Sequence, residues 1–527
     1  MSPAESAARP VADVCLVLEG TYPYTPGGVS SWVNDLLHAL PAVRFVVAHV
    51  GAERGAVAER RYVLPPNVTG LVDLHCRDPR PEPADGAALR RAARSARRRH
   101  ARPGRPSRVL EAFRRLLLEE PRGDAALLDD LASNDLSIAE FLHGGRTFDL
   151  ILEIGDRLAA EASFLHFFWH FRSMHLPLVR LLGAPPPPAA VYHALCTGYA
   201  GALAAVWSRR TGRPLLLTEH GIYTRERNLE LCRSLWLRGG GEASTVGAGD
   251  RCDEATASAL RRTWALHFLS LARCAYAQAS SIVSLSEVGR ARQIGDGAPA
   301  AKTWIVPNGV DPASRGALAS RIRLRGEDRR PLRVGFVGRV VPIKDIVTFI
   351  RACDLALSEV DLEARIIGPL DEDPAYVSRC RRLVADLGRG RAIRFEGQRP
   401  PDSIYRGIDV LVLTSFSEGQ PLVMLEAGAA GIPVIATDVG ACREMLEGRG
   451  DLDRSLGPGG IVTRLAAPAE TAAAIVRLAR DPRRRLRMGD AGRRRVAAFY
   501  RRDDCFARYG AFYSQGRWPG SAGASSA

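Results

Sequence analysis

The feature that most constrains this chain is an alternation of short apolar segments, closed by glycine or polar residues, with helical patterns between them. The apolar segments lie at 13–18, 45–50, 190–192, 215–218, 281–285 and 303–306, and again at 333–337, 363–367, 393–395, 410–413 and 434–436. Helical spacing of apolar residues occurs at 29–40, 346–357, 422–430 and 469–478. Buried strands that alternate with helices predict an α/β fold with parallel sheets.

The length of the chain predicts two large domains, because 527 residues exceed what one hydrophobic core ordinarily supports. The order strand, glycine loop, helix opens the chain and restarts at residue 333, and the turn-forming Pro307, Asn308 and Gly309 stand where a linker is expected. We predict Rossmann-like domains over 1–310 and 311–497, a helical insertion over about 76–145, a helix over 498–515 that returns to the first domain, and a disordered tail over 516–527.

The formal net charge of +15 raises the question of an anionic partner. Lys302 and Lys344 are the only lysines, and the arginines cluster most densely at 90–105. This cluster is interpreted first as a solvated segment, and second as a patch that docks on anionic lipid or an acidic partner. No RNP motif, zinc finger or basic zipper accompanies it, so we expect no nucleic-acid partner.

The apolar runs and the cysteines favour a globular, cytoplasmic protein whose thiols are reduced. No run approaches the ~20 apolar residues that span a bilayer, and no secretory signal is visible at the start of the chain. The ten cysteines form no CxxC pair, which fits reduced core thiols better than disulfides or a zinc site.

Two loops at strand ends in the first half are candidate binding elements. Gly27 and Gly28 follow the opening strand, where glycines let a ligand approach the backbone and helix amides favour an anion; tight turns also use such a pair. His220 follows the strand at 215–218 and could bond a sugar hydroxyl or a phosphate, although a histidine at a strand end is also commonly structural.

The first candidate loop of the second half carries two cations. Arg339 leaves a strand end and Lys344 stands near the next helix start, so both can reach one crevice. A guanidinium and an ammonium together can neutralise a diphosphate. The alternative is a solvated pair, but a chain that uses arginine nearly everywhere keeps one of its two lysines here.

The second such loop joins the strand at 410–413 to the helix at 422–430. Gly419, Gln420, Pro421 and Leu422 stand at the helix start, where free amides can surround an anion and proline supplies no donor. Glu418 would point at a pyranose, and Glu426, about one turn into the helix, could accept both hydroxyls of a ribose. Two solvated glutamates are the alternative.

These motifs resemble a known family. The set GR(x)4K followed by SFSEGQPLVMLEA is similar to family 4 of the retaining glycosyltransferases with the GT-B fold. The segments LEGTYPYTPGGVSSWV, FFWHFRSMHLPLVRLL, YHALCTGYAGALAA, TGRPLLLTEHGIYTRER and GRVVPIKDIVTFI resemble the PelF-like glycosyltransferases of Pel exopolysaccharide synthesis. The resemblance covers about 13–510 and implies two Rossmann-like domains that face each other across a cleft holding the active site.

The resemblance also implies roles for the candidate residues. Gly28 would offer its amide to the donor phosphate, and His220 would contact the transferred sugar. Arg339 and Lys344 would hold the pyrophosphate, Glu418 the sugar hydroxyls, and Glu426 the ribose. The donor would be a uridine diphosphate sugar, with no metal and no other cofactor. The acidic run 371–373 is interpreted as solvated, and Asp345 stands where many family members have glycine.

The expected function is transfer of a hexose or N-acetylhexosamine to a growing exopolysaccharide acceptor, with transient contact to an inner-membrane Pel-type export complex. Residues 90–105 are one candidate for that contact. The alternatives are a non-catalytic nucleotide-sugar-binding component of such a complex and a GT-B-fold nucleotide-sugar epimerase.

Overall fold

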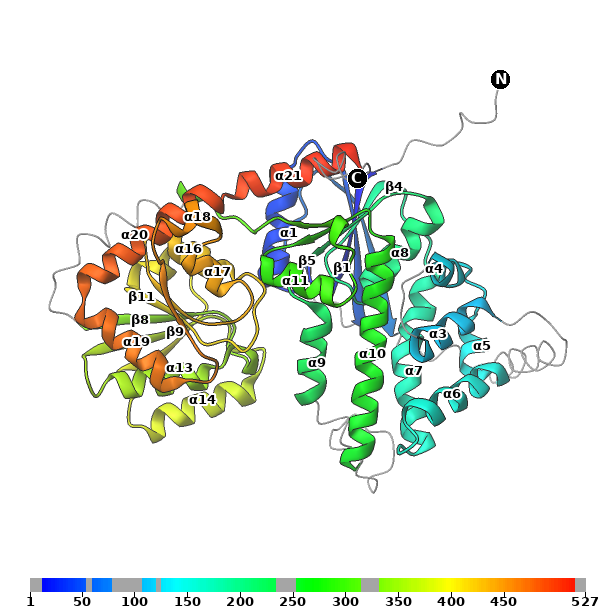
Figure 1. Ribbon diagram of the computed structural model, residues 1–527, viewed down its shortest axis with the longest axis horizontal. Coiled ribbons are helices and arrows are strands. Elements are labelled where there is room, and N and C mark those ends of the chain that lie inside the picture. Colours follow the sequence, from blue (N-terminus) through cyan, green and yellow to red (C-terminus); the bar gives the residue numbers. More distant parts are fainter. Residues whose placement is uncertain are drawn as a thin grey trace. The chain divides into compact units, whose positions relative to one another are not determined.

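The computed structural model describes residues 12–53, 59–77, 107–119, 125–233, 253–313 and 331–516, which form two compact units (Figure 1). The first unit comprises Met1–Ser284, Arg290–Trp304 and Tyr509–Ala527, and the second comprises Leu285–Gly289 and Ile305–Arg508. The arginine cluster at 90–105 and all but the first residue of the tail at 516–527 lie outside the described residues.

The first unit is built on a seven-stranded sheet of order β3-β2-β1-β4-β5-β6-β7. Its strands are β1 (Ala12–Glu19), β2 (Phe45–Glu53), β3 (Val68–Arg77), β4 (Ala189–Ala194), β5 (Leu215–Glu219), β6 (Ser281–Ser284) and β7 (Thr303–Ile305). The pairings from β3 through β6 are parallel. The central strands are nearly continuous apolar runs because helices cover both faces of such a sheet.

Helices surround this sheet, and those of the predicted insertion gather beside α7 and α8 (Figure 1). They are α1 (Gly28–Ala39), α3 (Arg108–Leu118), α4 (Ala125–Ala132), α5 (Ile138–His143), α6 (Gly145–Leu158), α7 (Phe164–Leu182), α8 (Tyr199–Thr211), α9 (Tyr223–Arg233), α10 (Glu254–Gln278) and α11 (Glu287–Gly295). The described part of the insertion therefore consists of helices and their connections, except that its first two residues end strand β3.

The second unit is a six-stranded parallel sheet of order β10-β9-β8-β11-β12-β13. Its strands are β8 (Leu332–Val337), β9 (Leu362–Ile367), β10 (Ile393–Gly397), β11 (Val410–Leu413), β12 (Val434–Thr437) and β13 (Gly460–Thr463). Its helices are α13 (Ile346–Ala356), α14 (Pro374–Asp386), α15 (Pro401–Ile404), α16 (Leu422–Ala429), α17 (Cys442–Glu447), α18 (Gly450–Arg454), α19 (Pro468–Arg480) and α20 (Pro482–Phe499). The α/β class with parallel sheets is confirmed.

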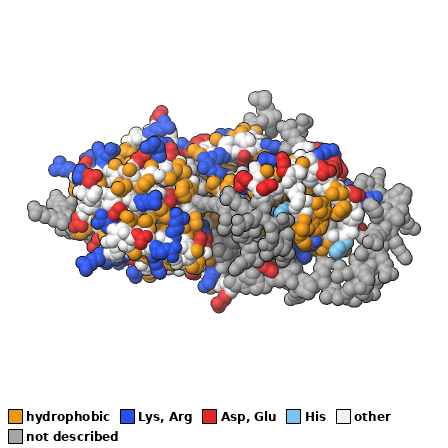
Figure 2. Space-filling model, turned by 90° about the horizontal axis from the view of Figure 1, so that it is seen from below, with side chains coloured by type: hydrophobic (Ala, Val, Ile, Leu, Met, Phe, Trp, Pro, Cys, Tyr) orange, Lys and Arg blue, Asp and Glu red, His pale blue; other side chains and the backbone are white. Residues whose placement is uncertain are grey.

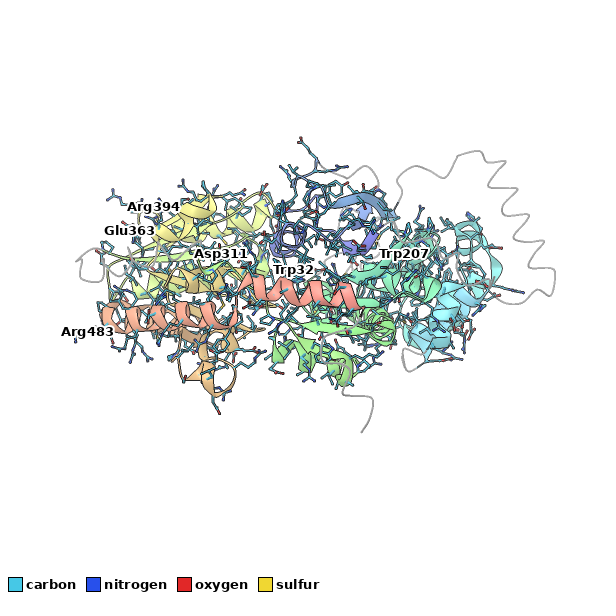
Figure 3. The ribbon with its side chains drawn as sticks, turned by 90° about the horizontal axis from the view of Figure 1, so that it is seen from above. Trp32, Trp207, Asp311, Glu363, Arg394 and Arg483 are labelled. Atoms are coloured by element: carbon cyan, nitrogen blue, oxygen red, sulfur yellow. The ribbon has the colours of Figure 1, made fainter. Side chains whose placement is uncertain are left out.

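The C-terminal helix α21 (Arg502–Gln515) contributes its second half to the first unit. The Tyr509 ring lies 5.1 Å from the Trp32 ring, and the Tyr513 hydroxyl is hydrogen-bonded to Nδ1 of His193 at 2.7 Å. Figure 3 shows Trp32 beside this helix. Aromatic packing and a buried hydrogen bond therefore attach the end of the chain to α1 and β4.

Two strands, β3 and β13, are absent from the sequence prediction. Both lie at sheet edges, so each pairs with one neighbour only. Most residues of β3 are partly exposed, and β13 has four residues that include a glycine. Neither segment therefore shows the continuous apolar run of a strand buried on both faces.

Two further findings concern the composition. None of the helices in the described ranges is long and apolar enough to cross a membrane. Nine described cysteines carry free thiols, and six of them are buried, as expected for reduced core residues.

Several histidines are buried in the first unit, and they predict how its stability depends on pH. Burial lowers the pKa of His175 to about 4, below about 6.5 in the unfolded chain. The unfolded state therefore binds the proton more readily between these two values, and stability falls as the pH falls through this window. We expect a loss of about 1 kcal/mol from His175 alone between pH 7 and 5.5.

The measurement is the free energy of unfolding by denaturant at pH 7 and 5.5 for the wild type and His175→Phe. The substitution should reduce the pH dependence by about that amount. An unchanged slope would contradict the assignment of His175 as a buried neutral group.

Candidate active site

The loop after β8 carries both predicted cations of the second unit. Hydrogen bonds from Val341 N to Arg339 O (3.1 Å) and from Lys344 N to Val341 O (3.0 Å) close this loop. Lys344 ends a short 3-10 turn, and Asp345 follows with a φ of 47°, in the left-handed region that favours glycine. The Asp345 side chain accepts a bond from Thr348 N at 3.2 Å and caps α13, so an aspartate has a structural use at this position.

The central contact of the site joins this loop to the loop after β11. Lys344 Nζ donates to Glu418 Oε1 at 2.6 Å, and the side chains are 19% and 9% exposed. Ser415 Oγ donates to the same oxygen at 2.6 Å. The structure thus brings together two residues predicted separately, and it neutralises the lysine with the glutamate.

Backbone contacts hold the Glu418 loop in place. Phe416 N donates to Ile343 O at 2.8 Å, and Ala441 N donates to Gly419 O at 2.9 Å. Gly440 has a φ of 53°, and a side chain on it would overlap the carbonyl oxygens of Glu418 and Gly419. The two loops after β11 and β12 can approach this closely only because residue 440 is glycine.

The predicted anion-binding segment lies at the start of α16, as expected. Pro421 is the residue before Leu422, the first residue of the helix. The side chain of Gln420 is buried, and its Oε1 accepts a bond from Asn308 N at 2.5 Å. The Oε1 atom of Gln420 therefore supports the loop.

Glu426 lies in the middle of α16 and accepts a hydrogen bond from the Tyr405 hydroxyl. Tyr405 is fully buried in the turn before β11, whereas Glu426 is partly exposed. The tyrosine therefore orients the carboxylate that was predicted to hold a ribose.

Arg339 forms an ion pair with Glu372 at 2.5 Å, and both side chains are nearly half exposed. Ion pairs of this exposure contribute little stability. The acidic run expected to be merely solvated has two structural uses, because Glu372 pairs with Arg339 and Asp373 caps α14 by accepting from Tyr376 N at 2.9 Å.

In the first unit, Gly27 and Gly28 stand at the exposed start of α1. Gly27 has an extended φ of 164°, and a side chain on either residue would meet nothing within 4 Å. Neither the backbone conformation nor internal packing therefore requires glycine here.

His220 follows β5 and packs edge-on against Trp32, with the ring centres 4.6 Å apart. Burial lowers its pKa to about 4, so the ring is neutral at pH 7. Its Nε2 atom is buried, and it has no hydrogen-bond partner among the residues that the structure describes. A buried nitrogen without a partner is costly in a folded protein, and His220 shares this feature with other histidines of the described ranges, among them His175 and His267.

Three side chains that support these residues were not predicted from the sequence. Ser415 stood in the quoted motif without a role, and Tyr405 had no recognisable signal. Glu219 was passed over in favour of its neighbour His220, yet it is a buried carboxylate that accepts from Tyr276 (2.6 Å), Gln293 (3.0 Å) and Thr197 (3.0 Å). These three donors order the end of β5, from which His220 emerges.

Within the described ranges, no group of three or more His, Cys, Asp or Glu side chains is placed to hold a metal ion.

The chain belongs to the family described as "Domain of unknown function (DUF3492)", whose model matches residues 12–301. The model described as "Glycosyl transferases group 1" matches residues 331–481, which include Arg339, Lys344, Glu418 and Glu426.

A curated relative is the D-inositol 3-phosphate glycosyltransferase of Corynebacterium jeikeium (strain K411). It is 29% identical over 207 residues, which are 37% of this chain and 48% of the relative. The chain thus spans about half the length of this curated relative.

Two solved structures show the fold. Anabaena Alr3699/HepE in complex with UDP and glucose is 15% identical, with a TM-score of 0.56 over 96% of this chain and 100% of that one. Sucrose-phosphate synthase from Thermosynechococcus elongatus is 17% identical, with a TM-score of 0.53 over 95% and 98%. The likeness establishes the GT-B fold predicted from the sequence.

A substitution at Gly440 tests whether the contact between the loops after β11 and β12 stabilises the site. Gly440→Ala would force a side chain against the Glu418 carbonyl, so we expect a loss of about 3 kcal/mol in the free energy of unfolding. The matched control is Gly388→Ala, because Gly388 also has a positive φ (66°) but open space around it. It should cost only about 1 kcal/mol of backbone strain. Equal losses in the two variants, measured by denaturant unfolding, would show that the loop contact is unimportant.

Proposed function

We propose that this chain is a retaining glycosyltransferase that moves a hexose or N-acetylhexosamine from a uridine diphosphate sugar to a growing exopolysaccharide. The observation that carries the proposal is the Lys344–Glu418–Ser415 contact at the carboxyl ends of β8 and β11. Ligands of open α/β sheets bind at this edge. The group 1 glycosyltransferase match over 331–481 supports the same conclusion.

The donor diphosphate is assigned to Lys344 and Arg339, with the free amides at the start of α16. Each cation is already paired with a carboxylate. Donor binding would therefore replace that carboxylate, or join it, with a phosphate as the partner of each cation. Arg339 can exchange easily because its pair is half exposed. Lys344 is more deeply placed, and its ammonium can bridge a phosphate oxygen and Glu418 because it has three donors.

The two glutamates are assigned to the sugar and the ribose. The bonds from Lys344 and Ser415 to Glu418 share Oε1, so Oε2 is left to accept a bond from a sugar hydroxyl. Glu426, oriented by Tyr405, would accept from the ribose hydroxyls.

The first unit is proposed to contribute Gly28 and His220. The open space at Gly28 suits close approach of a donor phosphate to its amide. The Nε2 atom of His220 would bond a hydroxyl of the transferred sugar. Because the ring is neutral at pH 7, this bond adds no charge beside the anomeric carbon.

The proposed reaction is a front-face substitution. The bond from the anomeric carbon to the β-phosphate oxygen breaks while the acceptor oxygen forms its bond on the same face. The acceptor proton passes to the departing phosphate oxygen. Lys344, Arg339 and the helix amides stabilise the charge that develops on this leaving group, which is the task a metal ion performs in other transferases.

The sequence segments that resemble the PelF-like enzymes make a Pel-type polysaccharide the proposed product. A transferase of this kind has to pass its product to an exporter, so contact with an inner-membrane assembly is part of the proposal.

Lys344→Ala should lower the rate of sugar transfer at least 100-fold, because the leaving diphosphate loses its ammonium. The matched control is Lys302→Ala, since Lys302 is the other lysine and its Nζ donates to Ala277 O at 3.2 Å in the first unit. The assay is release of uridine diphosphate from a panel of uridine diphosphate sugars.

Product analysis in the absence of an acceptor separates transfer from epimerisation, because an epimerase needs no acceptor.

A double variant separates catalysis from stability. Lys344→Ala leaves the poorly exposed Glu418 without its cation, so some stability is lost. Lys344→Met with Glu418→Gln removes both charges and should recover stability in thermal melts. Transfer should stay at least 100-fold below wild type in both variants, and recovery of transfer with stability would contradict the assigned role.

Metal removal provides a further test. If the cations and amides stabilise the leaving group, a chelator such as EDTA should change the transfer rate by less than about twofold. Loss of activity on chelation that added Mg²⁺ restores would overturn the metal-free mechanism.

A further inference from the structure

An exposed apolar surface lies on helices α6 and α7 of the first unit and contains none of the residues assigned above. Five of its side chains are between 41% and 46% exposed. Its members, here called the α6–α7 surface, are Phe148, Leu152, Phe164, Leu165, Phe168 and Trp169. Five of the eleven large apolar side chains that are exposed in the described residues thus fall within 148–169. Figure 2, which views the molecule from below, shows a continuous orange area on this end of the first unit.

The aromatic members form one contiguous cluster. The rings of Phe148 and Phe164 are 5.4 Å apart, those of Phe164 and Phe168 are 5.7 Å apart, and those of Phe168 and Trp169 are 5.4 Å apart. The Arg172 guanidinium lies 4.9 Å from the Trp169 ring centre. Contact across two helices shows that this is a formed surface rather than scattered exposed residues.

The start of α7 is apolar on both sides, which an ordinary surface helix is not. Phe167 and Phe171 face the core and are buried, while Phe164, Leu165 and Trp169 point outward. No acidic residue occurs within α7. Burial of the inward side against the core stabilises the fold. The outward apolar side chains contribute nothing to that core, so we infer that they contact a second apolar environment.

Cations border the surface at the turn between α6 and α7. Arg157 and Arg262 line a shallow hollow of about 340 Å³ there, together with Glu161 and Thr263. Arg157 also forms an ion pair with Glu153 of α6 at 3.2 Å. Arg172 lies above the aromatic rings, and the whole chain carries +15. Two acidic residues, Asp149 and Asp156, are exposed on α6 and limit how deeply that helix could enter an apolar phase.

We propose that the α6–α7 surface docks the protein on an anionic phospholipid bilayer. Tryptophan, phenylalanine and leucine would enter the boundary between headgroups and acyl chains, where such side chains concentrate in membrane proteins. Arg157, Arg172 and Arg262 would contact lipid phosphates, and the net charge would attract the protein to the surface. This inference is independent of the proposed catalytic function.

The test is co-sedimentation of the full chain with vesicles of phosphatidylcholine alone and of phosphatidylcholine with 30% phosphatidylglycerol. The wild type should bind the anionic vesicles, more weakly at high salt. Trp169→Ala and Leu165→Ser should each lower the partition coefficient about tenfold. The matched control, Leu452→Ala, changes a leucine that is 75% exposed elsewhere and should bind as the wild type.

Three outcomes would overturn the proposal, provided circular dichroism shows folded variants. One is a wild type that binds neither vesicle, and another is binding that Trp169→Ala and Leu165→Ser leave unchanged. The third is a wild-type dimer in light scattering that Trp169→Ala converts to a monomer without vesicle binding, because the surface would then join two copies of the chain.

Discussion

One largely buried ion pair joins Lys344 to Glu418, and it connects two loops although these residues are 74 positions apart in the sequence. The fold makes this contact possible because β8 and β11 are neighbours in a parallel sheet, so their carboxyl ends open at the same edge. Everything proposed about the donor depends on it. The ammonium is positioned before any ligand arrives, and the carboxylate beside it is held by Ser415.

The surrounding structure serves to keep that geometry. Gly440 allows the loop after β12 to pack on the Glu418 backbone, Gln420 attaches the loop to Asn308, and Asp345 caps α13 directly after the lysine. Preorganised groups of this kind stabilise a developing charge without reorganisation at the moment of reaction. In the first unit, buried hydrogen bonds to Glu219 and His193 order the strand ends near His220 in the same way.

The sequence predicted the fold well where strands are buried on both faces, because a parallel central strand is a continuous apolar run. It failed at β3, most of whose residues are partly exposed, and at β13, which has only four residues and includes a glycine. For the site, glycines, cations and glutamates at strand ends were recognisable. Their pairing was not, since the link between Lys344 and Glu418 depends on strand order rather than on spacing. Tyr405 and Glu219 act through long-range hydrogen bonds and leave no local pattern.

The most direct test of the account is a crystal structure of the full chain with uridine diphosphate bound. We expect a phosphate oxygen within about 3 Å of Lys344 Nζ, the length of a typical charge-assisted hydrogen bond, and the ribose hydroxyls bound to Glu426. A nucleotide bound elsewhere, with Lys344 still engaged only with Glu418, would contradict it.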